Sequence, residues 1–350
     1  MIKVLIVDDS QSARQLLTEI LNSAPDIHVV GTAGNGLEAL EAIKRVRPDV
    51  ITMDIYMPLM DGFETTSRIL ETDPIPIIIV SACYTAEEVE KTFMAIGVGA
   101  LAILPKPRIT DLTYKESAKE IVQTVRLMSE VKVVTRRSRL PRKGTENGKP
   151  LCIVTRGLPL NATAIRAVVM GASTGGPPVL QTILSLLPPD FPVPVLVVQH
   201  IASGFLQGMI DWLGQTVSLP ISIALHGEPA QPGHIYFAPD GCHMSIAGDN
   251  RMLLSTEPPE NGMRPSISHL FRSAAGSLRR HAAGVLLTGM GKDGAVELKL
   301  MRDRGAVTIA QDEESSVIYG MPGEAVKLEG ALYVLPPDSI AEILKGVVQQ

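Results

Sequence analysis

An apolar run at residues 167–170 leads directly into the small-residue segment Gly-Ala-Ser-Thr-Gly-Gly at 171–176. Such a run, ending in small residues, is typical of a buried parallel strand that stops at a tight turn. Apolar residues then recur at helical spacing from Val179 to Leu187. The pattern predicts a strand, a turn at Ser173 and a helix whose first N–H groups can face a developing negative charge. Because many glycine-rich turns bind phosphate or only reverse the chain, this turn alone leaves a functional and a merely structural role equally open.

The first part of the chain, residues 1–128, alternates short apolar segments with helical patterns. The apolar segments are residues 4–7, 28–32, 50–53, 77–80 and 100–104. Strands separated by single helices predict an α/β fold with a doubly wound, five-stranded parallel sheet of the flavodoxin-like kind. In such a sheet the ligand site lies beyond the carboxyl ends of the strands.

Polar residues stand at those carboxyl ends. Asp8 and Asp9 follow the first segment, Asp54 the third, Ser81 the fourth and Lys106 the fifth. Three carboxylates at one edge repel one another unless a hard divalent cation lies among them, and carboxylate oxygens are ligands that Mg²⁺ prefers. The lysine and the hydroxyl supply the charge and the hydrogen bond that a phosphoryl group needs. The set therefore predicts an aspartate that can be phosphorylated.

These positions closely resemble the receiver domain of bacterial response regulators. The motifs that carry the resemblance are the acidic pair, Asp54-x-x-Met57-Pro58-x-x-Asp61-Gly62, Ser81 and Lys106-Pro107. The resemblance implies that Asp54 is the phosphoacceptor, and that Ser81 and Lys106 contact the phosphate. It also implies that Mg²⁺ is held by Asp8, Asp9, Asp54 and the carbonyl of Tyr56. One position departs from the family, because Ile103 stands where a Phe or Tyr is usual, which puts an aromatic switch in doubt.

Residues 129–165 read as a linker between the two domains. A basic run from Arg136 to Lys143 precedes a Gly/Asn/Pro-rich stretch with little apolar pattern, which is typical of an exposed flexible connector. The basic run could contact nucleic acid or an acidic partner, but a solvated linker is the commoner reason for it. The net charge of -5 argues against nucleic acid as the main partner of the chain.

The second domain, residues 166–350, is predicted to be a doubly wound, mostly parallel α/β domain. Ser173, His200 and Asp293 each follow a strand-like segment, and parallel strands would bring all three to one edge of the sheet. A hydroxyl, an imidazole and a carboxylate are the groups that acyl transfer needs. Their order along the chain differs from the Ser, Asp, His order of α/β-hydrolases. A dinucleotide site is disfavoured because the G-x-G-x-x-G spacing is missing.

Two further features of this domain have open interpretations. Residues 232–246 predict a β-hairpin around Pro239-Asp240-Gly241. Arg264 precedes a predicted helix through Ile267, Leu270 and Phe271. This arginine is either a ligand for a substrate carboxylate or an ordinary loop residue.

Several motifs of this domain look like those of the chemotaxis protein-glutamate methylesterase family. They are Gly171-Ala172-Ser173-Thr174-Gly175-Gly176, Gln199-His200, Pro232-Gly233-His234-Ile235-Tyr236-x-Ala238-Pro239, Arg264-Pro265-Ser266 and Thr288-Gly289-Met290-Gly291-x-Asp293-Gly294-Ala295. The resemblance implies that Ser173 is the nucleophile, His200 the base and Asp293 its orienting partner. Backbone N–H groups near Thr174 and Met290 would form the oxyanion site, and the ester chemistry would need no metal.

The resemblance covers nearly the whole chain and implies a function. The family hydrolyses γ-glutamyl methyl esters on the cytoplasmic helices of chemoreceptors and deamidates particular glutamines there. A chemotaxis histidine kinase would phosphorylate the receiver, which otherwise covers the esterase cleft. Two alternatives remain: a non-catalytic response regulator whose second domain docks a partner, and a DNA-binding regulator, for which no helix-turn-helix pattern is visible.

Composition fits a cytoplasmic chain with two cores. At 350 residues and 45% hydrophobic content the chain can bury two domains. The cysteines Cys83, Cys152 and Cys242 are scattered and lack C-x-x-C spacing, which disfavours disulfides and a zinc site. The start of the chain turns acidic too soon for a signal peptide, and no apolar run is long enough to span a bilayer. We therefore expect no membrane insertion.

Overall fold

The computed structural model describes residues 1–82, 86–107, 114–131 and 165–348. The chain divides into two compact units between Gly148 and Lys149, a point inside the predicted linker. Residues 132–164 of that linker lie outside the described part, as do Cys83 and Cys152.

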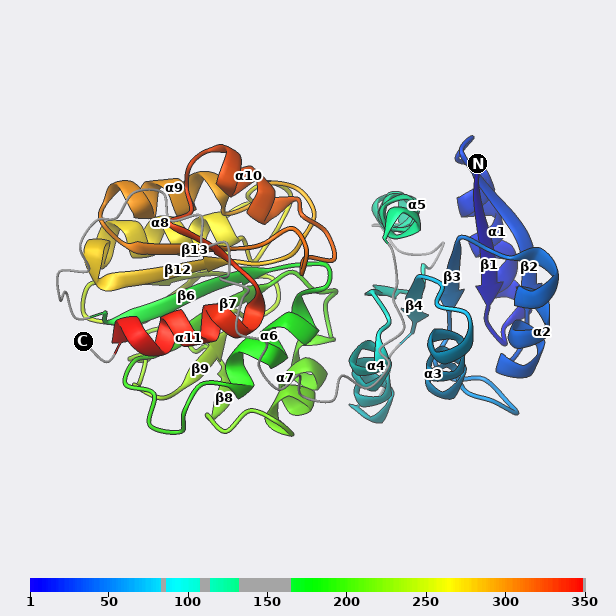
Figure 1. The fold of residues 1–350 in the computed structure, drawn as a ribbon, viewed down its shortest axis with the longest axis horizontal. Helices are drawn as coiled ribbons and strands as arrows, with labels where there is room; N and C mark the ends of the chain where they lie inside the picture. The colour runs from blue at the N-terminus through cyan, green and yellow to red at the C-terminus, as the bar shows by residue number, and fades with distance from the viewer. Residues whose placement is uncertain (83–85, 108–113, 132–164, 349–350) are drawn as a thin grey trace, which may run out of the picture. The chain divides into compact units, whose positions relative to one another are not determined.

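The first unit is a five-stranded parallel sheet with strand order β2-β1-β3-β4-β5 (Figure 1). Its strands are β1 (Ile2–Val7), β2 (Ile27–Ala33), β3 (Val50–Met53), β4 (Ile77–Ser81) and β5 (Ala102–Pro105). The predicted doubly wound, flavodoxin-like sheet is confirmed. Because the chain winds in opposite directions from β1 and β3, the carboxyl ends of these two strands flank the site expected for such a sheet.

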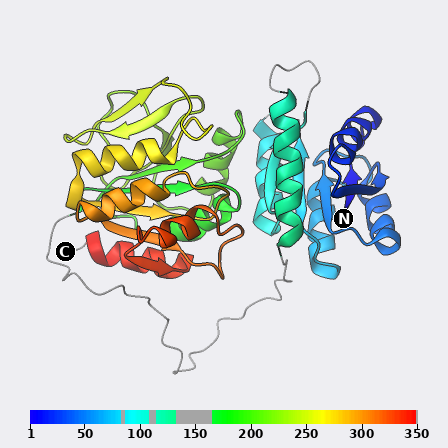
Figure 2. The ribbon, with the colours of Figure 1, turned by 90° about the horizontal axis from the view of Figure 1, so that it is seen from above.

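Helices cover both faces of this sheet. They are α1 (Gln11–Asn22), α2 (Gly36–Val46), α3 (Gly62–Thr72), α4 (Ala86–Val98) and α5 (Tyr114–Glu130). Helices α1 and α5 lie on one face, whereas α2, α3 and α4 form a row on the other (Figures 1 and 2). The side chains of Ser10, Asn35 and Asp61 cap the first three helices by accepting backbone N–H groups. The helix predicted to end near Met128 continues to Glu130.

The second unit contains a seven-stranded sheet in which all neighbours pair in parallel, with order β14-β13-β12-β6-β7-β9-β8. Its strands are β6 (Ala167–Ala172), β7 (Val195–Gln199), β8 (Ile221–Ile223), β9 (Ile235–Phe237), β12 (Ala282–Leu286), β13 (Val307–Gln311) and β14 (Tyr333–Leu335). The long strands are buried along their length and mostly apolar, as expected for a sheet covered on both faces. The predicted doubly wound α/β architecture is confirmed.

Two groups of helices enclose this second sheet. They are α6 (Gly176–Ser185), α7 (Leu206–Gly214), α8 (Ile267–Ser277), α9 (Ala295–Asp303), α10 (Met321–Lys327) and α11 (Pro337–Val348), with a 3-10 turn at Arg279–His281. Helices α8, α9 and α10 cover one face, and α6, α7 and α11 cover the other (Figure 1). Across the described residues, every helix is too short or too polar to traverse a lipid bilayer.

The β-hairpin was predicted in the wrong place. The segment before the Pro239-Asp240-Gly241 turn is β9, and its two edges are occupied by β7 and β8 in the main sheet. The segment after the turn, β10 (His243–Ile246), pairs instead with β11 (Met252–Ser255) in a separate antiparallel hairpin. The turn is real, but it carries the chain from one sheet to the other because β9 has no free edge left for β10.

Candidate functional site

Ser173 lies at the turn that follows β6, as its sequence context predicts. Its backbone N–H donates to the carbonyl of Thr288 at 3.0 Å, which joins this turn to the one after β12. The two turns also touch at Gly289, where an added Cβ would lie 2.5 Å from the Cβ of Ser173. Only a glycine at 289 therefore allows the second turn to approach the serine so closely.

His200 lies beside Ser173 at the end of the neighbouring strand β7. Its backbone N–H donates to the carbonyl of Ala172 at 2.9 Å. In the imidazole, Nε2 is 3.0 Å from Oδ2 of Asp293. Both ring nitrogens are buried, and neither makes a hydrogen bond of regular geometry among the described residues; Nε2 has the short contact with Asp293, whereas Nδ1 has no charged partner there. The structure thus brings His200 and Asp293 into contact and leaves one imidazole nitrogen available for a reacting group.

Asp293 is held at the start of α8, although it belongs to the loop before α9. Its Oδ2 accepts the backbone N–H of Ile267 at 2.7 Å. Its Oδ1 accepts the Ser266 hydroxyl at 2.9 Å and the Ser268 N–H at 3.1 Å. The Asn261 side chain adds a longer bond to Oδ1, of 3.2 Å. The carboxylate therefore caps α8 from another element, where the helix dipole also favours a negative charge.

These partners determine the charge of Asp293. The residue is 4% exposed, and burial by itself would raise its pKa. The interactions with His200, Ser268 and the Ile267 N–H outweigh burial and hold the pKa of Asp293 well below its ordinary value. Asp293 is therefore an anion at neutral pH, as required of a group that orients and stabilises an imidazolium.

The Ser173 hydroxyl is not hydrogen-bonded to His200 in the described part of the structure. Ser173 and His200 are instead joined through the backbone at adjacent strand ends. Catalytic hydrogen bonds are often long or absent without substrate and tighten when it binds. Thr174 and Met290 stand in the two turns flanking Ser173, and among the described residues their backbone N–H groups donate to no protein acceptor.

The contacts of the Arg264 side chain account for this residue without a bound ligand. It lies in the exposed loop before α8, and its Nη1 donates to the carbonyls of Thr256 and Glu257 at 3.0 and 3.1 Å. These bonds tie the loop after β11 to the start of α8. Of the two interpretations of this arginine, the ordinary loop residue has direct contacts to support it.

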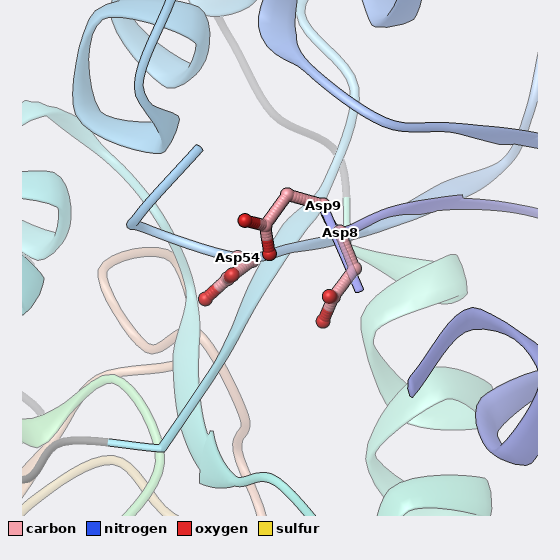
Figure 3. A group of neighbouring side chains, drawn as sticks. All are labelled: Asp8, Asp9 and Asp54. Atoms are coloured by element: carbon pink, nitrogen blue, oxygen red, sulfur yellow. The ribbon is translucent and has the colours of Figure 1, made fainter. Parts of the chain in front are cut away.

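The receiver unit gathers its own cluster at the ends of β1, β3 and β5. One carboxylate oxygen from each of Asp8, Asp9 and Asp54 lies within 4.8 Å of the others (Figure 3). Lys106 Nζ is 2.8 Å from an oxygen of Asp8 and 2.8 Å from one of Asp54. Ser81 is buried at the end of β4, and its carbonyl accepts the Lys106 N–H at 3.0 Å. All five residues predicted from the strand ends are thus close together.

The electrostatics of this cluster suit a divalent cation. Burial is the main reason that the pKa of Asp54 is raised to about 6, and Lys106 only partly offsets it, while the Asp8 charge adds to the rise. Three oxygen ligands, two of them from buried side chains, provide the donor set that Mg²⁺ prefers. A cation among them would neutralise the repulsion between Asp8 and Asp54. The residues present therefore fit a magnesium ion.

Comparisons with known proteins give a family match for each of the two units. Residues 4–115 match the response regulator receiver domain, and residues 168–344 match the CheB methylesterase family. Protein-glutamate methylesterase/protein-glutamine glutaminase 1 of Syntrophus aciditrophicus (strain SB) is 52% identical over 98% of this chain and 97% of its own length. A relative from Geobacter metallireducens, named protein-glutamate methylesterase/protein-glutamine glutaminase 4, is 51% identical over 100% of both chains.

The chain belongs to the protein-glutamate methylesterase/protein-glutamine glutaminase family. Its second unit also resembles the CheB methylesterase catalytic domain of Thermotoga maritima, with a TM-score of 0.52 and 35% identity over 53% of this chain and 100% of that one. In this methylesterase-family chain a receiver domain therefore precedes a CheB methylesterase domain.

Sequence reasoning missed the residues that hold Asp293 in this methylesterase-family fold. Ser266 belonged to a motif used for the resemblance, but it had no assigned role, and Ser268 and Asn261 were not singled out. A buried histidine was also missed: Nδ1 of His243 accepts the Ser266 N–H at 3.2 Å. A serine just before a helix usually predicts a cap made by its own side chain, which would have suggested the wrong partner here.

Proposed function

We propose that this chain is a phosphorylation-activated hydrolase. Its substrates are γ-glutamyl methyl esters, and particular glutamines, on the cytoplasmic helices of chemoreceptors. Ser173 is the nucleophile, His200 the general base and Asp293 the group that orients the imidazole. The chain acts in the cytoplasm, where demethylation gives adaptation in chemotaxis. Family membership supports the substrate class, because the relatives carry that activity in their names.

The observation that carries the catalytic assignment is the 3.0 Å contact between His200 Nε2 and Asp293 Oδ2. The buried carboxylate stays ionised because two helix N–H groups and the Ser266 hydroxyl donate to it. It therefore favours a proton on Nε2 and leaves Nδ1 with a lone pair. Ser173 lies at the adjacent strand end, so Nδ1 is the atom that takes the proton from its hydroxyl.

The reaction follows an acyl-enzyme route. Ser173 Oγ forms a bond to the side-chain carbonyl carbon of the glutamyl ester, and its proton passes to His200 Nδ1. The N–H groups of Thr174 and Met290 stabilise the oxyanion. The bond to the methoxy oxygen breaks, and methanol leaves with the proton from the imidazolium. Water then hydrolyses the acyl-enzyme by the same proton transfers; with a glutamine substrate the leaving group is ammonia.

Regulation depends on the receiver. A chemotaxis histidine kinase donates a phosphoryl group to Asp54, with Ser81 and Lys106 contacting the phosphate. Asp8, Asp9 and Asp54 would hold Mg²⁺, which would supply positive charge near the phosphoryl group. Lys106 already bridges Asp8 and Asp54, so a phosphoryl group on Asp54 would change its ion pairs. We propose that this change shifts the population from a packing of the two domains that restrains the esterase to one that releases it.

The test is methanol release from membranes containing methylated receptors, with and without a small phosphodonor. The wild-type chain should release methanol faster when phosphorylated. Ser173→Ala should release none while Asp54 is still phosphorylated, whereas Asp54→Asn should keep the basal rate and lose the stimulation. Equal release by wild type and Ser173→Ala would refute the nucleophile, whereas no release by the wild type would favour a non-catalytic docking module.

A further inference from the structure

The last residue of β7, Gln199, has a side chain that connects two parts of the candidate active site. It is 5% exposed. Its Nε2 donates to the carbonyl of Ser173 at 2.9 Å and to the carbonyl of His200 at 2.8 Å. Both N–H bonds of one buried amide are therefore used to join the residue proposed as nucleophile to the residue proposed as base.

No other described side chain bonds to both of these residues. Apart from the Gln199 amide, the turns after β6 and β7 are connected by the strand pairing, which ends at Ala172 and Gln199, and by the bond from the His200 N–H to the Ala172 carbonyl. Beyond that point no backbone hydrogen bond joins the two turns among the described residues. Gln199 thus sets the spacing of the two residues after the sheet hydrogen bonds stop.

The oxygen of the same amide is also constrained. Oε1 of Gln199 is buried and has no hydrogen-bond partner among the described residues. An added Cβ at Gly176, the first residue of α6, would lie 2.2 Å from it and 2.9 Å from the Cβ of Ala172. The amide therefore fits between α6 and the Ser173 turn only because residue 176 is glycine. A buried polar atom left without a partner is unfavourable, which suggests that the position of Nε2 is what this side chain provides.

We propose that Gln199 is a positioning residue for the reaction, a role that rests on the proposed function. Its amide keeps the Ser173 turn and the His200 turn at the separation that proton transfer needs. Gln199 does not touch the substrate; it acts through the two carbonyls. Displacement of reacting groups by about 1 Å can lower a rate by about 100-fold. Loss of the amide should therefore lower turnover without weakening substrate binding.

Two variants remove the constraint in different ways. Gln199→Met keeps an unbranched side chain of similar length and removes both donors; the Ser173 carbonyl still accepts the Gly176 N–H at 2.8 Å, so the turn retains a bond. Gly176→Ala keeps the amide but forces it to move. We expect each to lower kcat about 10- to 100-fold with KM unchanged. The double variant should be less impaired than the product of the two effects, because both act through one contact.

The assay uses the full chain and two readouts. Methanol release is measured per active site, titrated with a small fluorophosphonate that reacts with activated serines, and the rate constant of that labelling is measured separately. Thr308→Val is the matched control, since Thr308 is also buried in this sheet and its hydroxyl accepts the Leu332 N–H at 3.0 Å, away from both turns. It should lower the melting temperature and leave both rates per titrated site within twofold.

The outcomes separate this inference from the proposed function. If the wild type is labelled but releases no methanol, the esterase assignment fails, and slower labelling of Gln199→Met still supports the positioning role. The positioning role is refuted if Gln199→Met and Gly176→Ala behave like Thr308→Val. It is also refuted if their lower activity comes from a higher KM and not from a lower kcat. If Ser173 of the wild type is not labelled at all, both proposals are refuted.

Discussion

Substitution of Asp293 by asparagine tests the candidate active site most directly. Asp293 accepts hydrogen bonds at both oxygens, so an amide –NH₂ group must face a donor in either orientation. The less damaging orientation places –NH₂ at Oδ2, where it opposes the Ile267 N–H and faces His200. The charge-assisted hydrogen bond from the Ile267 N–H is then lost, and the bonds from Ser266 and Ser268 are made to a neutral oxygen and become weaker. We expect the free energy of unfolding to fall by about 2–4 kcal/mol.

The same orientation of the new amide also reverses which nitrogen of the His200 imidazole carries the proton. The amide introduced by Asp293→Asn would donate to Nε2 of His200, so the proton of the neutral ring would move to Nδ1. Nδ1 could then no longer accept the proton of Ser173. A triad with the wrong tautomer loses about 10⁴-fold in kcat. We therefore expect Asp293→Asn to be folded, less stable and almost inactive.

Two measurements check this expectation. Urea unfolding gives the stability, and methanol release from methylated receptors gives kcat. The control is Asp303→Asn in the same unit. The Asp303 side chain is 55% exposed, and within the described part of the chain its one ion pair is with Lys299, one helical turn away. This control should change stability by less than about 0.5 kcal/mol and keep its activity. If Asp293→Asn keeps activity within tenfold of wild type, the orienting role of Asp293 is refuted.

Three further perturbations act on acid stability, on the Ser173 turn and on the carboxylate cluster. The pKa of Asp293 is lowered in the folded state, so below about pH 4 the Asp293 carboxylate is protonated in the unfolded chain before it is protonated in the folded one. The free energy of unfolding of the wild type, measured by urea titration, should therefore fall with acid more steeply than that of Asp293→Asn. Parallel pH profiles of the two proteins would contradict this. Gly289→Ala places a Cβ 2.5 Å from that of Ser173, so fluorophosphonate labelling should slow at least about tenfold; an unchanged rate would show that the turns need not touch. Asp9→Asn removes one of the three clustered carboxylates. It should raise the Mg²⁺ concentration for half-maximal Asp54 phosphorylation about tenfold, equivalent to about 1.4 kcal/mol, and EDTA should stop phosphorylation of both the wild type and the variant. An unchanged Mg²⁺ requirement would exclude Asp9 as a ligand.

The receiver could be predicted almost completely from the sequence. Its strands are short apolar runs bounded by polar residues, and parallel strands with helical connections have few possible arrangements. Once the strands are assigned, Asp8, Asp54 and Lys106 must lie at one edge, because each directly follows a strand. The sequence also shows that Ile103 stands where receiver domains usually have Phe or Tyr, and this residue packs against the receiver core.

The second unit was less predictable where elements are short or where a contact crosses the fold. The three residues of β9 are too few to show an alternation of polar and apolar side chains, which would tell a strand of a hairpin from a strand inside a parallel sheet. The turn that follows β9 therefore led to the wrong prediction of a hairpin. The bonds from Ser266 and Ser268 to Asp293 join residues that are 27 and 25 positions apart. Only the packing of α8 against α9 brings them together. Gln199 was likewise quoted only as part of a motif, because its two partners depend on strand register.

The two buried aspartates show how surroundings shift the pKa of the same residue type in opposite directions. Asp54 has one backbone donor and Lys106, and burial with the neighbouring Asp8 charge raises its pKa to about 6. It is an anion that its surroundings stabilise incompletely, so a cation or a phosphoryl bond can relieve the excess charge. Asp293 receives backbone and hydroxyl donors at the start of a helix, which lower its pKa, and it remains charged. Under the proposed function, the carboxylate that reacts is left short of donors, and the one that stays ionised is surrounded by them.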